Sequence, residues 1–179
     1  MADPCFADAL DQFRKYRALA EKALEQVPGE AWFRVPAPEA NSIALVMKHL
    51  SGNMRSRWTR FLDTDGEKPD RDRDTEFEER AGDDARSIRA RWDEGWDLLF
   101  ATLGSLGEKD LERIVTIRRE PHTVRQAIHR QLTHYSYHVG QIVLLARLHA
   151  GASWRSLSIP KGKSKEYEVS KDGKPYRPA

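Results

Sequence analysis

Residues 123–151, TVRQAIHRQLTHYSYHVGQIVLLARLHAG, decide the fold, because their pattern predicts one long helix. Thr123 is a favourable N-cap, and Gly151 is a typical residue at a helix C-terminus. Inside this helix His134 and His138 stand four residues apart, so their rings leave the same face about one turn from each other. Two imidazoles at this spacing can share a metal ion, which makes the pair a candidate metal site.

The face that carries the two histidines is apolar at its ends and polar in its middle. Gln141 falls on this face one turn beyond His138, and the stripe is completed by Ala127, Gln131 and Leu145. Such a stripe predicts a site inside a helical bundle. Histidine pairs at this spacing also arise on solvated faces, so the pair alone does not settle the matter. His49, in a second predicted helix with the sequence SIALVMKHLSGNMRSRW, favours the metal site.

The segments KHLSGN, which contains His49, and HYSYHVGQ, which contains His134 and His138, together resemble the DinB-like (YfiT-like) family. The resemblance covers roughly residues 6–151 and points to an uncharacterised branch. It implies a four-helix bundle of the up-down-down-up type, often dimeric. It also implies a divalent metal held by His49, His134 and His138. Some members are thiol-cofactor-dependent transferases or isomerases, and many have no assigned activity.

The predicted elements agree with an all-α fold. Apolar residues recur at helical spacing over residues 3–28, 42–63, 83–106 and 123–151. Alternating β-branched residues at 114–117 predict a short extended segment, or a two-stranded ribbon, before the last helix. Residues 63–80 are polar and charged, so we expect a solvated loop with a short helix after Thr75.

One domain is expected over residues 1–151, followed by a tail over 152–179. The tail is basic and rich in Gly, Pro, Lys and Ser, a composition typical of disorder. Trp154, Leu157 and Ile159 are nevertheless spaced like anchors, so we expect residues 153–160 to pack on the bundle.

The three remaining histidines are not expected to reach the site. His122 precedes His134 by twelve residues, or about 18 Å of helical rise. His129 lies about 140° around the helix from His134, at 100° per residue. His149 shares the face but lies about 16 Å beyond His138.

Three residues are candidates for contacts around the metal or with a substrate: Asn53, Gln141 and Tyr137. Asn53 either binds substrate or water, or makes a hydrogen bond between helices. Tyr137 is about 60° from the ligand face and Tyr135 about 100°, at 100° per residue, which favours Tyr137. Arg57 and Arg60, further along the second helix, either meet an anionic ligand at the mouth of the site or are solvated.

Composition excludes several classes of function. With 30 basic and 28 acidic residues the formal net charge is +2, so the chain lacks the excess of basic residues that a nucleic-acid-binding groove needs. No stretch is apolar enough to span a membrane, and the N-terminal residues do not resemble a signal peptide. The single cysteine, Cys5, excludes an internal disulfide and fits a cytoplasmic location.

Three neutral imidazoles suit Zn, Ni, Co, Fe or Cu and do not suit Ca or Mg. Three protein ligands leave a coordination position open, as in catalytic sites, for a water or for a low-molecular-weight thiol. We therefore expect a metal-dependent enzyme acting on a small molecule, either a thiol-dependent transferase or a hydrolase. The alternative is a non-catalytic, stress-related metal-binding bundle. A homodimer is expected from the many apolar positions over 42–63 and from the family tendency.

Overall fold

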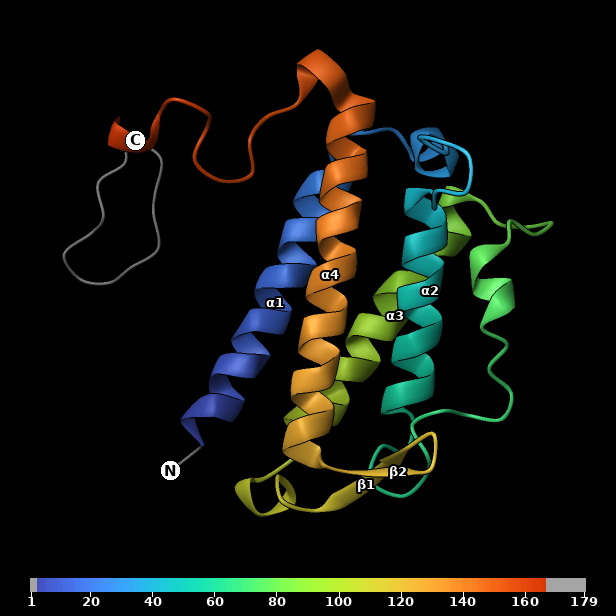
Figure 1. The fold of residues 1–179 in the computed structure, drawn as a ribbon, viewed down its shortest axis with the longest axis vertical. Coiled ribbons are helices and arrows are strands. Elements are labelled where there is room, and N and C mark those ends of the chain that lie inside the picture. Colours follow the sequence, from blue (N-terminus) through green and yellow to red (C-terminus); the bar gives the residue numbers. More distant parts are fainter. Residues whose placement is uncertain (1–2, 167–179) are drawn as a thin grey trace.

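The computed structural model of the chain describes residues 3–166 and is mostly helical (Figure 1). The predicted all-α class therefore holds in its coarse form, and β1 and β2 form the only sheet among the described residues. The elements are α1 (Pro4–Leu24), η1 (Gly29–Phe33), α2 (Ile43–Trp58), η2 (Asp74–Phe77), α3 (Ala85–Gly104), η3 (Glu108–Asp110), β1 (Ile114–Ile117), β2 (Glu120–Thr123), α4 (Val124–Ala150), η4 (Gly151–Ser153) and η5 (Ser164–Glu166), where η denotes a short 3-10 helix.

The four long helices begin where side chains cap their first turns. The capping residues are Asp3, Ser42, Asp84 and Thr123, and each accepts a hydrogen bond from a backbone N–H three residues on. The predicted C-terminal ends were less accurate. Helix α2 stops at Trp58 and not near residue 63, because Thr59 is extended and Arg60 has a positive φ of 47°. Helix α1 likewise ends at Leu24, a few residues before its predicted end at 28.

Polar contacts at the helix ends fix the directions of the helices. Arg125 Nη2 donates to Asp3 Oδ2 at 3.0 Å, which joins the starts of α1 and α4. Thr102 Oγ1 donates to the carbonyl of Trp58 at 3.1 Å, which joins the ends of α2 and α3. Figure 1 shows that α1 and α4 run in one direction and α2 and α3 in the other.

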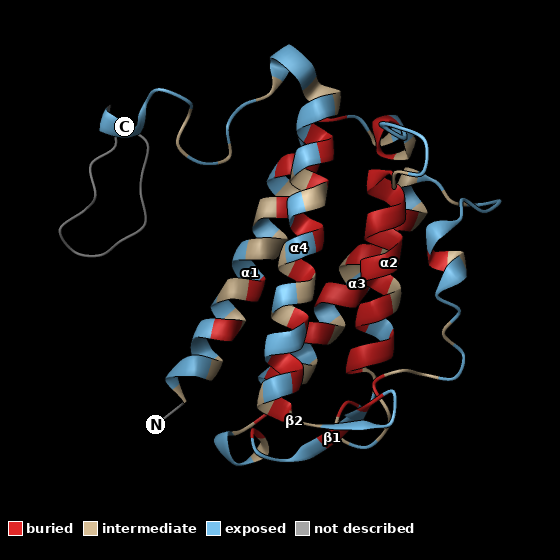
Figure 2. Ribbon diagram, in the orientation of Figure 1, coloured by how far each residue is buried: buried red, intermediate tan, exposed pale blue. Residues whose placement is uncertain are grey.

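Helix α2 is the most enclosed element of the fold. Fourteen of its sixteen residues are buried, and Figure 2 shows it in red along nearly its whole length. Trp58 on α2 joins Trp92, Trp96 and Tyr135 among the largest fully buried side chains. Its apolar positions are therefore used inside the chain, and α2 does not present the spare surface from which we expected a dimer interface.

The segment between α2 and α3 is mostly exposed, as expected, but two of its charged side chains are buried. The short helix predicted after Thr75 is present as η2, and η2 packs against α2. Glu76 within it is buried, and the side chain of Arg71 is only 4% exposed. For these two side chains the expectation failed, because it treated alternating charges as solvated, whereas here the charges pair with one another beneath the surface.

The extended segment before α4 is present as a two-stranded antiparallel ribbon, in which Ile114 pairs with Thr123 and Ile117 with Glu120. The turn between the strands places Arg118 and Arg119 at positive φ. Both of their backbone N–H groups donate to the carboxylate of Asp65, at 2.9 and 2.7 Å. The ribbon is thereby tied to the segment that follows α2.

Part of the predicted tail packs on the helices. Trp154 and Leu157 are partly buried against the core, and Ile159 is half-buried. The backbone N–H of Arg155 donates to Gln26 Oε1 at 2.7 Å. Residues 167–179 of the predicted tail lie outside the described residues.

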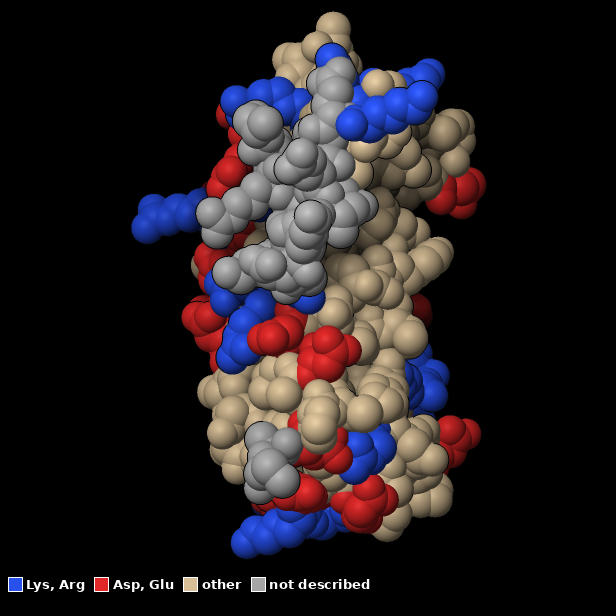
Figure 3. Space-filling view, turned by 90° about the vertical axis from the view of Figure 1, so that its left-hand side faces the viewer, with Lys and Arg blue, Asp and Glu red and all other residues tan. Residues whose placement is uncertain are grey.

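Basic and acidic side chains are interspersed on the face shown in Figure 3 and are not segregated by sign. No helix within residues 3–166 has both the length and the apolar character that crossing a membrane requires.

Candidate metal centre

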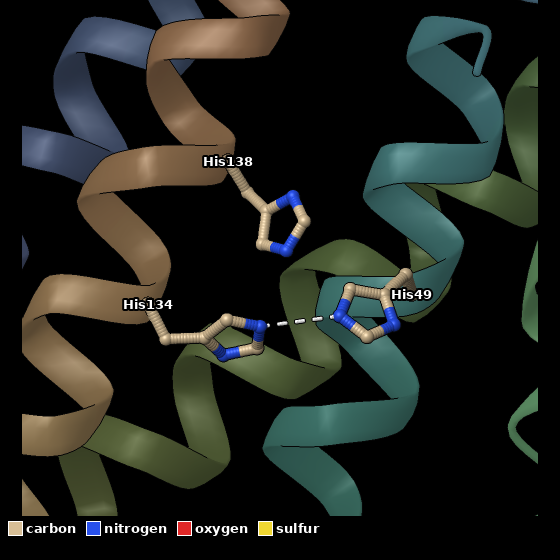
Figure 4. Close-up of side chains that lie close together, drawn as sticks. All are labelled: His49, His134 and His138. Carbon is tan, nitrogen blue, oxygen red and sulfur yellow. Dashed lines mark hydrogen bonds between the residues drawn. The ribbon is translucent and has the colours of Figure 1, made fainter. Parts of the chain in front are cut away.

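Three histidines from two helices meet in the space between α2 and α4 (Figure 4). His49 comes from α2, and His134 and His138 come from α4; one possible ligand atom from each lies within 4.8 Å of the others. His49 Nε2 and His134 Nε2 are 3.2 Å apart. Two nitrogens bound to one tetrahedral zinc ion at about 2.0–2.1 Å would be about 3.3 Å apart. His49 and His134 therefore have the spacing of two ligands of one ion, and with His138 they form the only group of three that could hold a metal among the described residues.

The ring of His49 is held from behind by a carboxylate. Its Nδ1 lies 2.9 Å from Glu76 Oε2. Arg71 in turn donates to both oxygens of Glu76, from Nε at 2.8 Å and from Nη2 at 2.9 Å. Because an ionised carboxylate only accepts, Nδ1 of His49 carries the hydrogen and Nε2 presents its lone pair to the site.

His138 is oriented in the same way by an amide. Its Nδ1 lies 2.7 Å from Gln141 Oε1, and Gln141 Nε2 donates to the hydroxyl of Tyr137 at 3.2 Å. The amide oxygen accepts the Nδ1 hydrogen, so the lone pair of Nε2 is again left for the site. Two of the three rings are thus fixed in the form that binds metals.

Burial favours the neutral form of the two histidines of α4. It lowers the pKa of His134 to about 3, and repulsion from His138 and His49 adds to the effect. Burial also lowers the pKa of His138, although the hydrogen bond with Gln141 opposes it. For Glu76 burial favours the protonated form, but the hydrogen bonds from His49 and Arg71 outweigh burial and lower its pKa. His134 and His138 therefore favour the neutral form and Glu76 the ionised form, as metal binding through these histidines requires.

The approach of Glu76 depends on Gly52, which lies on α2 one turn beyond His49. A Cβ atom at this position would overlap Oε1 of Glu76. On the same side the ring of Phe77 stacks on that of His49, with centroids 4.7 Å apart and planes inclined at 26°. Residues 71–77 therefore cover the outer side of His49 and limit the access of water to it.

Two hollows are lined by residues that contact the histidines, although none of the three histidines lines either hollow. One of about 310 Å³ lies between residues 36–41 and α4, and Gln141 and Leu144 line it. The other, of about 490 Å³, lies on the far side of α2 and is bordered by Gly52, Arg71 and Glu76. The first hollow reaches Gln141, which is the hydrogen-bond partner of His138.

The other predicted contact residues take different places. Asn53 is buried, and its Oδ1 accepts from the hydroxyl of Tyr135 at 3.0 Å. This is the interhelical hydrogen bond that we considered as the alternative to a substrate contact. Tyr137 is 64% exposed and lies against His138, with ring centroids 5.0 Å apart. Tyr135 is fully buried beside His134, at 5.5 Å between centroids.

The remaining histidines lie outside the group. His122 is on β2 with its Nδ1 3.0 Å from the carbonyl of Glu120, His129 is exposed, and His149 is half-buried near the end of α4. Of the two arginines expected either at the mouth of the site or in solvent, Arg60 is exposed, whereas Arg57 is buried and therefore not solvated.

Glu76 and Arg71 are the site residues that the sequence prediction missed. Two features of the sequence could have indicated them. Phe77 is an aromatic residue within a run of charges, which suggests an anchored segment. Gly52 interrupts a helix next to a candidate ligand, and a glycine there often marks the close approach of another group.

The fold and the three imidazoles together define a mostly helical protein with a possible histidine metal site. The chain matches the family described as "Protein of unknown function (DUF1572)" over residues 1–163, and it belongs to that family. A comparison with curated proteins finds no match.

Proposed function

We propose that the chain binds a divalent transition metal through His49, His134 and His138 and acts as a metal-dependent enzyme on a small molecule. The observation that carries this proposal is the convergence of three imidazoles, two of them buried and one half-buried, with no carboxylate among them. Burial favours the neutral form of His134 and His138. The nearest carboxylate, Glu76, is turned away from the site because it accepts from His49 and Arg71. Three protein ligands leave a position open, as in catalytic sites.

The set of three nitrogens suits Zn, Ni, Fe or Co. When bound, such an ion supplies a Lewis-acidic position at which a thiol or a water loses its proton near neutral pH. The residues of the chain supply the geometry: Glu76 and Gln141 orient two of the rings, and Phe77 covers the His49 side.

A low-molecular-weight thiol is the co-substrate that we favour over water. The three ligands are neutral, so the ion keeps its full charge in a partly enclosed site, and an anionic thiolate is favoured there. The resemblance to DinB-like proteins, some of which are thiol-dependent transferases, supports the same choice. In this reading the chain transfers a thiol to an electrophilic small molecule. A hydrolase that uses water at the same position is the alternative.

We also infer that the four helices form a four-helix bundle of the up-down-down-up type. The parallel pairs α1/α4 and α2/α3, joined at their ends by Arg125–Asp3 and Thr102–Trp58, support this arrangement. A homodimer is proposed through α4, where Tyr137, Leu144 and Leu148 are exposed. Exposed apolar side chains gathered on one helix face commonly mark an interface.

Cobalt substitution tests the thiol proposal, because Co(II) has a visible spectrum that reports its ligands. Adding 2-mercaptoethanol or cysteine to the Co(II)-loaded protein should produce a sulfur-to-metal charge-transfer band. His138→Ala should abolish the band, and His129→Ala, which removes an exposed histidine on the same helix, should keep it. If neither thiol changes the visible spectrum of the Co(II)-loaded protein, the result would favour the hydrolase or a non-catalytic metal-binding role.

A further inference from the structure

Arg57 is a buried cation without a hydrogen-bond or ion-pair partner among the residues that the structure describes. It lies on α2, two turns beyond His49 and on the same face as Asn53, and it is only 3% exposed. Its Nε and Nη1 atoms are enclosed and have no hydrogen-bond partner, and no carboxylate of residues 3–166 forms an ion pair with it. Arg71, which is equally buried, is instead bound through all three of its nitrogens by Glu67 and Glu76.

An unpaired buried charge is costly, because its interaction with water is lost and nothing replaces it. Burial lowers the pKa of Arg57 to about 10, which leaves the guanidinium charged at neutral pH. The charge of Glu67 acts favourably on Arg57, but neither neighbouring acid pairs with it directly. Glu67 accepts from Arg71 and Arg118, and Glu76 accepts from Arg71 and His49. This part of the molecule therefore lacks an anion.

The position of Arg57 follows from the pairing of α2 with α4. The two helices run antiparallel, and Asn53 is hydrogen-bonded to Tyr135 across their contact. Arg57 lies one turn after Asn53 on α2, and Gln131 lies one turn before Tyr135 on α4. Gln131 is 1% exposed, and its Oε1 also has no hydrogen-bond partner. Two polar side chains with unused hydrogen-bonding groups thus lie one turn beyond the Asn53–Tyr135 contact, on the side away from His49.

Arg57 is also close enough to the histidines to act on them. Its charge contributes to the lowered pKa of His134, and it lowers that of Tyr135 as well, against the larger effect of burial. About 12 Å of helical rise separates the α-carbons of residues 49 and 57, and the Cβ of a helical residue tilts towards the N-terminus, here towards His49. A small molecule would have to span this distance to contact both the metal position and Arg57.

We propose that Arg57 binds a carboxylate of the small molecule that enters the metal site, with the Gln131 amide as a second contact. The amide can present either its oxygen or its nitrogen to the ligand. The carboxylate belongs either to the thiol or to the electrophile that the thiol attacks. That the ligand also binds a metal rests on the proposed function. That its carboxylate binds Arg57 does not depend on the proposed function.

The first experiment measures the carboxylate alone. Thermal unfolding of the full chain is followed with increasing propionate, against sodium chloride at the same ionic strength. Propionate should raise the unfolding temperature of the wild type more than chloride does. Arg57→Gln should remove the difference, and Arg60→Gln, which removes an exposed charge three residues on, should retain it.

Arg57→Met covers the case in which the glutamine variant does not fold. It should be more stable than the wild type without ligand, because the unpaired charge is gone, and it should not respond to propionate. A wild type that responds equally to propionate and chloride would overturn the proposal. So would a propionate response that survives in Arg57→Met.

The second experiment identifies the source of the carboxylate. The Co(II)-loaded protein is titrated with 3-mercaptopropionate and with the neutral 3-mercaptopropanol. A carboxylate on the thiol should make the first bind at least about tenfold more tightly, as expected for a hydrogen-bonded charge, and Arg57→Met should equalise the two. If the wild type binds both thiols equally and propionate still stabilises it through Arg57, the carboxylate belongs to the electrophile. If neither thiol changes the spectrum, the proposed thiol reaction is wrong. The role of Arg57 is then tested by the propionate experiment alone.

Discussion

At the scale of single residues, the ring of His49 is the most closely held of the three. Glu76 fixes its hydrogen, Arg71 fixes Glu76, and Phe77 stacks on it. Partners of this kind orient metal ligands and increase their basicity, and removing one typically weakens metal binding by about 10–100-fold. We expect Glu76→Gln to weaken zinc binding within that range while His49 itself is unchanged. Competition with a chromophoric chelator measures the affinity.

The matched control is Glu79→Gln, which removes an exposed carboxylate three residues away. It should bind zinc as the wild type does. Circular dichroism must show that both variants are folded, since Glu76→Gln also deprives Arg71 of its charged partner. A folded Glu76→Gln protein with undiminished zinc affinity would show that Glu76 only neutralises Arg71.

The difference between the predicted and the missed residues has a physical origin. His134 and His138 are related by the period of one helix, which the sequence displays directly. His49 lies on another helix, and its role came from the order of motifs in a resembling family. Glu76 meets His49 across 27 positions of sequence, within a segment that has no period. Only the path of the backbone between α2 and α3 brings the two together.

At the scale of elements, the segment between α2 and α3 depends on a glycine in α2. Replacing a helical glycine by alanine ordinarily raises the free energy of unfolding, by about 1 kcal/mol. Gly52→Ala should lower it instead, by about 1–3 kcal/mol, because the added Cβ overlaps Glu76 and breaks its bonds to His49 and Arg71. Urea denaturation measures the change.

Gly140→Ala in α4 is the control for this prediction, since a Cβ there meets no atom within 4 Å. It should show the ordinary helical stabilisation of about 1 kcal/mol. If Gly52→Ala were stabilised as much as Gly140→Ala, the segment around Glu76 would not be held against α2 as described.

Helix starts were better predicted than helix ends for a related reason. An N-cap depends only on local sequence, because one side chain accepts a hydrogen bond from a backbone N–H three residues on. Ser42 and Thr123 therefore predict the starts of α2 and α4. The end of α2 has no such local signal. Phe61 continues the apolar period of α2 and is buried, but it lies in the turn after the helix. The helix has already ended before Arg60, whose positive φ depends on the surrounding structure.

At the scale of the whole molecule, the proposed dimer rests on α4. Leu144 is 57% exposed and Leu148 58%, and both lie on the face that also carries Tyr137. We expect light scattering to give twice the mass of the chain. Leu144→Glu combined with Leu148→Glu should give the monomer mass, because two charges would be buried in the interface. Arg147→Glu, an exposed change between them, should leave the dimer intact. A wild type of monomer mass in dilute solution would contradict the proposal.

The measurement that tests the central claim most directly is the metal content of the purified protein and of six histidine variants. Elemental analysis should find close to one transition-metal ion per chain in the wild type. His49→Ala, His134→Ala and His138→Ala should each lose it, because two imidazoles bind too weakly. His122→Ala, His129→Ala and His149→Ala, whose side chains lie outside the group, should keep it. Metal retained in any of the first three variants would remove that histidine from the site, and a folded wild type that binds no transition metal even when one is supplied would contradict the account.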